Sequence, residues 1–118
     1  MPDAPRRHPV WAVLAELYLD VELQEEDYRR MAAVCAASGF GWPEIRQMNY
    51  DEVAPVLWAN LLSVAGEWAG WDETWLIATL TARYTGKRHR LLGLESLWRR
   101  AVDSFTAEGM ARVAAQLP

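Results

Sequence analysis

Two pairs of adjacent carboxylates, Asp51-Glu52 and Asp72-Glu73, have the residue types needed for acid–base chemistry. Two acids whose surroundings separate their pKa values can carry out proton transfer or glycoside hydrolysis. Adjacent residues at a helix start point to different sides, however, and acids at that position act as caps and as partners of the helix dipole. The sequence therefore favours a structural role for both pairs. Glu67 differs, because it lies between Gly66 and Trp68, where no cap is required.

Metal and nucleophile chemistry has little support in the sequence. The chain has two histidines, His8 and His89, and one cysteine, Cys35. A zinc site would have to depend on carboxylates, so we expect no metal and no cofactor. Ser63 falls in the middle of an expected helix, and His89 lies in a basic turn without a carboxylate beside it, which argues against a Ser-His pair. We therefore expect no catalytic residue.

The length and composition are those of one globular domain. The 118 residues include 52% hydrophobic and 24% charged residues, enough to bury a core without a disulfide or a metal. The single Cys35 cannot form an intramolecular disulfide and fits a reducing cytoplasm. No run approaches the roughly 20 apolar residues of a membrane span. We expect a flexible N-terminal arm at residues 1–8 and a single helical domain at residues 9–118.

Charge is distributed unevenly along the chain. Residues 10–80 carry twelve acids and three arginines, whereas residues 81–118 carry seven bases and three acids. An acidic body suggests a partner with a basic surface. The basic run from Arg83 to Arg90 has the content of a small nucleic-acid patch, but the net charge of −4 works against phosphate binding, so nucleic acid is not the expected partner.

Apolar residues recur at helical spacing through most of the chain, and no alternating segment is long enough for a strand. Pro9 suits the first turn of a helix, Ser38-Gly39 a helix end, and Pro55 the first turn of a core helix from Glu52. Thr106 is expected to cap a last helix. The fold class is all-α, a compact orthogonal bundle of about six or seven short helices. The expected helices cover residues 9–19, 24–37, 43–49, 52–65, 73–84, 91–105 and 106–117.

The stretch from Glu52 to Trp71 reads E-V-A-P-V-x-x-x-N-L-L-S-V-A-G-E-W-A-G-W, and P-V-W-x-x-L-x-x-L-Y-L-D precedes it from Pro9 to Asp20. With these motifs the chain resembles an uncharacterised bacterial family of small helical proteins, a domain of unknown function. The resemblance covers about residues 9–80. It implies no reaction, and therefore no catalytic residues.

These observations predict a non-enzymatic protein-binding module. Most concretely, we expect an immunity-type protein that neutralises a cognate bacterial toxin by covering its active site, because an acidic, tryptophan-bearing surface complements a basic cleft. The alternative is a small enzyme or small-ligand binder with a Trp-lined pocket around Glu67. The sequence contains nothing that fixes an oligomeric state. The expected partner-binding residues are Glu67, Trp68, Trp71, Asp72 and Glu73, with Glu22, Glu25 and Glu26 as a second acidic patch.

Overall fold

The structure, a computed structural model, describes residues 4–18, 22–57, 73–85 and 95–118. Within these ranges it contains helices and no strand, which confirms the all-α prediction. The count of five α-helices is slightly lower than the six or seven expected. They are α1 (Ala4–Ala15), α2 (Glu25–Ala37), α3 (Trp42–Met48), α5 (Glu73–Thr85) and α6 (Glu95–Ala115), with a 3-10 turn η1 (Glu16–Tyr18) and a π-helical turn η2 (Asn49–Val53).

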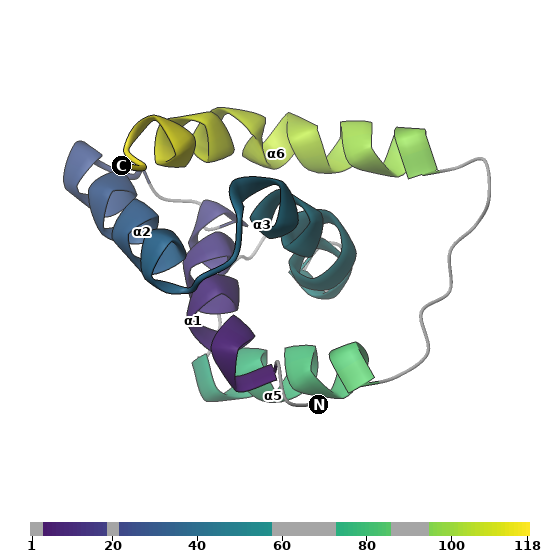
Figure 1. The fold of residues 1–118 in the computed structure, drawn as a ribbon. Coiled ribbons are helices and arrows are strands. Elements are labelled where there is room, and N and C mark those ends of the chain that lie inside the picture. Colours follow the sequence, from purple (N-terminus) through teal and green to yellow (C-terminus); the bar gives the residue numbers. More distant parts are fainter. Residues whose placement is uncertain (1–3, 19–21, 58–72, 86–94) are drawn as a thin grey trace.

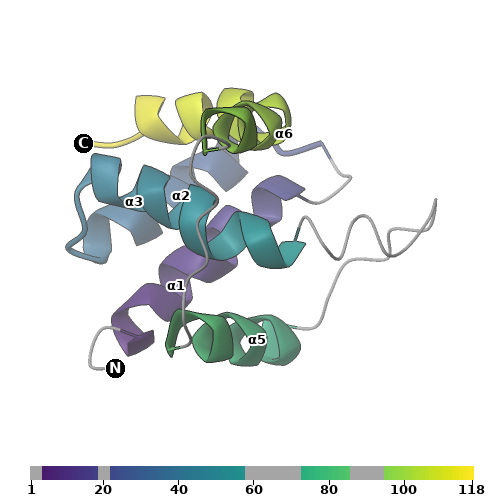
Figure 2. The same cartoon turned by 90° about the vertical axis from the view of Figure 1, so that its right-hand side faces the viewer.

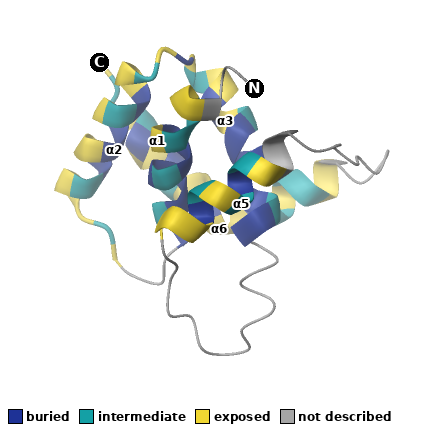
Figure 3. Ribbon diagram, turned by 90° about the horizontal axis from the view of Figure 1, so that it is seen from below, coloured by how far each residue is buried: buried dark blue, intermediate teal, exposed yellow. Residues whose placement is uncertain are grey.

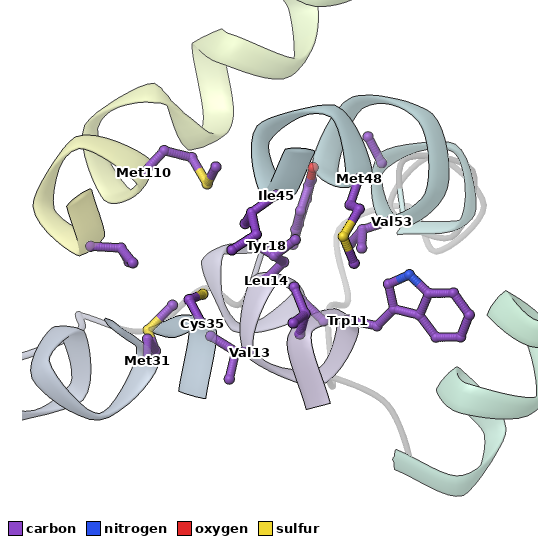
Figure 4. Packing of buried hydrophobic residues seen from close by; sticks show 14 of the residues in the cluster. Trp11, Val13, Leu14, Tyr18, Met31, Cys35, Ile45, Met48, Val53 and Met110 are labelled. Carbon is purple, nitrogen blue, oxygen red and sulfur yellow. The ribbon is translucent and has the colours of Figure 1, made fainter. Parts of the chain in front are cut away.

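Helix α1 lies at the centre of the described residues (Figures 1 and 2). It packs against α2, α5 and η2, and α6 packs against η1, which continues α1. Buried residues line the inward sides of the helices, and exposed residues lie on their outward sides (Figure 3). Leu14 and Tyr18 lie between the α2 side chains and those of α3 and η2 (Figure 4). The side chains that meet there are Leu14, Tyr18, Met31, Cys35, Met48 and Val53.

The first helix begins earlier than the predicted start at Pro9. Helix α1 begins at Ala4, so residues 4–8 are helical and Pro9 lies inside the helix instead of opening it. Long-range contacts explain the earlier start. The guanidinium carbons of Arg6 and Arg7 lie 4.6 and 5.1 Å from the ring centroid of Phe40, a cation–π arrangement. These contacts join residues more than 30 positions apart and leave no local pattern in the sequence.

Helix α2 begins and ends almost as expected. The backbone N–H of Gln24 donates to the Asp27 carboxylate at 2.8 Å, which satisfies a donor at the helix start. Gly39, with φ of 83°, supplies the left-handed conformation after the last turn. Helix α5 also matches its predicted range within one residue, with Leu76 and Leu80 buried. Its Trp75 is 41% exposed.

The expected break between residues 43–49 and the core helix is absent. Helix α3 runs into η2, and residues 54–57 continue as α-helix, so Glu52 is not a helix start. The N–H of Ala54 donates to the carbonyl of Asn49, five residues back. In this pattern, in which each N–H donates to the carbonyl five residues back, the donor to the carbonyl of Tyr50 would be residue 55, which is a proline and has no N–H. The carbonyl of Tyr50 instead accepts from Trp98 Nε1 at 2.9 Å, so a side chain of α6 replaces the missing backbone donor.

Helix α6 is one helix of 21 residues, whereas the sequence predicted a break capped by Thr106. Thr106 is buried within it and donates to the carbonyl of Val102, four residues back, at 3.0 Å. A threonine can bond in this way without ending a helix, so the cap prediction is wrong. No helix in the described ranges is both long enough and apolar enough to cross a membrane.

Candidate functional site

The predicted partner-binding residues divide into a described and an undescribed group. Glu67, Trp68, Trp71 and Asp72 lie outside the described residues, so the predicted Trp-lined pocket around Glu67 also lies outside them. Glu73 opens α5 and is exposed. The second predicted patch, Glu22, Glu25 and Glu26, is exposed at the start of α2, and we call it the α2 acidic surface.

The α2 acidic surface adjoins the end of α6. Gln116 Nε2 donates to the Glu25 carboxylate at 2.5 Å, and the Arg112 guanidinium lies 5.2 Å from the ring centroid of Tyr28. The start of α2 therefore lies beside the C-terminus, whereas α5 lies on the opposite side of the molecule (Figure 1). The structure thus does not bring Glu73 together with Glu22, Glu25 and Glu26. Partners of these two acidic regions would approach from different sides.

A buried ion pair that the sequence did not suggest joins α1 to η2. Arg7 Nη1 donates to both carboxylate oxygens of Glu52, at 3.0 and 2.8 Å, and Trp11 Nε1 donates to Glu52 Oε1 at 2.7 Å. The side chains are 11% and 7% exposed for Arg7 and Glu52. A signal for this burial was available: in a continuous helix Glu52 falls in phase with Ile45 and Val56, both buried.

A second buried group links three elements. Tyr18 Oη donates to Asn49 Oδ1 at 2.7 Å, and Asn49 Nδ2 donates to Thr106 Oγ1 at 3.1 Å. All three residues are buried, and burial is the main cause that raises the pKa of the Tyr18 hydroxyl. Because buried polar groups require partners, this chain of hydrogen bonds fixes η1, η2 and α6 relative to one another.

Among the described residues, Cys35 and His8, which have classical reactive groups, are engaged in packing. Cys35 is fully buried, and burial raises the pKa of its thiol to about 11, which keeps it protonated at neutral pH. His8 lies 5.4 Å from Trp11 between ring centroids, and its Nε2 lies 3.3 Å from Thr81 Oγ1. Among the residues that the structure describes, no group of three His, Cys, Asp or Glu could hold a metal ion.

A groove of about 250 Å³ lies between the α3–η2 segment and α6. At its edge Tyr50 Oη donates to Asp103 Oδ1 at 2.6 Å. The pKa of Tyr50 is raised, first by burial and then by this hydrogen bond. Sequence reasoning missed the groove, because its walls come from segments about 60 residues apart. Its lining consists of Trp42, Arg46, Asn49, Tyr50, Asp103, Ala107, Met110, Ala111 and Ala114.

Comparison with known proteins identifies the family. No curated protein and no solved structure is significantly similar to the chain. A family model described as "Domain of unknown function (DUF7079)" matches residues 5–116, which include all of η1, α2, α3, η2, α5 and α6 and nearly all of α1. The match extends well past residue 80, where the resemblance seen in the motifs stops. The chain therefore belongs to this family, a domain of unknown function.

Proposed function

We propose that this chain is a non-enzymatic protein-binding module, most concretely an immunity-type protein that covers the active site of a cognate toxin in the bacterial cytoplasm. The observation that carries the proposal is the α2 acidic surface, whose three carboxylates, Glu22, Glu25 and Glu26, are exposed at one helix start. Acidic groups arranged in this way attract a partner with a basic cleft and accelerate its association.

Several other polar side chains are bonded to one another inside the fold, which supports a binding function over catalysis. Glu52 is held by Arg7 and Trp11, and Asn49 is held between Tyr18 and Thr106. Groups fixed in this way stabilise the fold and are not presented to a substrate. The alternative, a small enzyme or ligand binder around Glu67, concerns a residue that lies outside the described part of the chain.

The proposal is tested by co-expression with toxins encoded beside the gene. A triple charge reversal of the α2 acidic surface, Glu22→Lys, Glu25→Lys and Glu26→Lys, is expected to abolish rescue of growth and to slow association at low salt at least tenfold. Glu44→Lys is the control, because Glu44 is also exposed in the first turn of a helix, α3. If no neighbouring gene product is toxic, or if wild-type protein rescues none, the immunity assignment is wrong.

A further inference from the structure

The groove between α3–η2 and α6 has one wall of large side chains and one wall of small ones. Trp42 and Tyr50 stand on the first wall. Ala107, Ala111 and Ala114 recur on one side of α6 and form the second wall, where any larger residue would fill the space. Two buried residues, Asn49 and Met110, and two charged residues, Arg46 and Asp103, complete the lining.

The hydrogen-bonding capacity of the groove lies at its rim. The Asn49 side chain is already bonded to Tyr18 and Thr106, so it offers little to a ligand. Asp103 accepts the Tyr50 hydroxyl through Oδ1, and its Oδ2 accepts from no residue in the described part of the chain. Arg46 is exposed and also approaches the Tyr50 hydroxyl. An acceptor and a cationic donor therefore lie beside one phenol.

This combination matches a peptide better than a charged ligand. The two charged residues of the lining, Arg46 and Asp103, are together neutral. The Arg99 guanidinium lies 4.7 Å from the Tyr50 ring centroid, outside the lining, and donates to Gln47. A peptide group carries one N–H donor and one C=O acceptor. The volume of about 250 Å³ falls below the roughly 300–1,000 Å³ of pockets that enclose a whole ligand, and it suits one large side chain. Interfaces commonly place such an anchor in a desolvated pocket.

The groove also adjoins the surface already assigned to a partner. Ala114 lines the groove, and Gln116, two residues further along α6, donates to Glu25 of the α2 acidic surface. Two residues of helix rise only about 3 Å but are turned by roughly 200°, so the groove and the α2 acidic surface lie on different sides of the end of α6. A protein seated on the α2 acidic surface reaches the groove by extending around the end of α6.

We propose that this groove binds a short segment of a partner protein. The segment inserts one large apolar side chain between Trp42 and the alanines of α6. Its neighbouring peptide N–H donates to Asp103, and its C=O accepts from Arg46. The inference rests on the proposed function for one point, that the partner is a protein.

The test is an amide NMR titration of the whole chain with N-acetyl-L-tryptophanamide, which carries an apolar side chain and two peptide groups. Its size implies a dissociation constant on the order of 1 mM. We expect saturable shifts at residues of the groove, at least tenfold weaker binding of N-acetylglycinamide, and weaker binding of zwitterionic tryptophan. Asp103→Asn is expected to weaken binding severalfold.

A groove-filling substitution supplies the matched control. Ala111→Trp is expected to abolish the shifts, whereas Ala115→Trp, also exposed on α6 but outside the groove, is expected to leave them unchanged. Absence of saturable shifts in the wild-type protein, or shifts that persist in Ala111→Trp, would overturn the proposal. Equal or tighter binding of free tryptophan would instead assign a small-molecule site. None of these outcomes depends on toxin rescue, so the groove and the immunity assignment can fail separately.

Discussion

The buried pair of Arg7 and Glu52 allows a quantitative prediction about stability. Glu52→Gln keeps an acceptor for Trp11 Nε1 but removes the negative charge that faces Arg7 at 2.8 Å. Both side chains are almost fully buried, so the remaining guanidinium cannot regain its hydration without opening the structure. Removing one partner of such a pair costs about 3–5 kcal/mol of unfolding free energy. That is a large part of the roughly 5–15 kcal/mol that stabilises a typical domain.

The assay is a double-mutant cycle with urea unfolding followed by circular dichroism. Arg7→Met and Glu52→Gln are each expected to destabilise strongly, and the double variant is expected to cost less than their sum by about 2 kcal/mol or more, because neither charge remains buried alone. Arg30 and Glu16 are the control pair, since they make two bonds of 2.9 and 2.6 Å but are 49% and 26% exposed.

The coupling energy of Arg30→Met with Glu16→Gln is expected to be about 0.2–1 kcal/mol, the usual value for a solvated pair. The reasoning would be refuted if the Arg7 and Glu52 cycle were additive within about 0.5 kcal/mol, or if its coupling did not exceed that of the exposed pair.

Three further outcomes are expected. Asn49→Leu should cost about 2–4 kcal/mol in urea unfolding, because it leaves the buried Tyr18 hydroxyl without an acceptor, and adding Tyr18→Phe should then cost little more. Trp98→Phe should cost about 1–3 kcal/mol, and less in a Pro55→Ala background, where residue 55 regains an N–H for the Tyr50 carbonyl; equal costs in both backgrounds would contradict this account. Cys35 is fully buried and its pKa is raised from 9.0 to about 11, so it should react with iodoacetamide at pH 8 at least roughly 100-fold more slowly in the native state than in urea. Because the Cys35 thiol has a higher pKa in the folded state than in the unfolded state, it holds its proton to higher pH when the protein is folded. The contribution of Cys35 to the free energy of unfolding is therefore complete below pH 9 and declines as the pH rises toward 11.

The sequence was sufficient to predict those helices whose ends are set by residues next to them in the chain. Helix α2 has acids in its first turn and Gly39 after its last, and both signals are read within a few residues. The start of α1 could not be predicted in this way, because it depends on Phe40 and Glu52. The Pro- and Arg-rich composition of residues 1–8, at the start of the sequence, is what made them resemble an arm.

The errors at Pro55 and Thr106 have one physical cause. Helix rules assume that backbone groups find partners within the helix, so a proline is taken as a start and a threonine as a cap. Here the indole N–H of Trp98 in α6 donates to the backbone carbonyl of Tyr50, and the Thr106 hydroxyl accepts from the Asn49 side chain. Each contact spans about 50 residues. The same limit hid the groove, whose alanines on α6 become a wall only once α3 lies opposite them.

The central position of α1 also matters for how the chain folds as it is synthesised. Among the described helices, α1 comes earliest in the chain, and it is covered by later segments, including α5 and, through η1, α6. Gly109 lies so close to Leu17 that an added Cβ would come within 2.6 Å of its Cδ2, so this part of the core closes only after residue 109 has left the ribosome. Because the chain is synthesised at about 5–20 residues per second, the apolar face of α1 stays uncovered for several seconds before the last segments that pack on it are made. We expect chaperones or provisional contacts to shield the apolar face of α1 from aggregation during that interval.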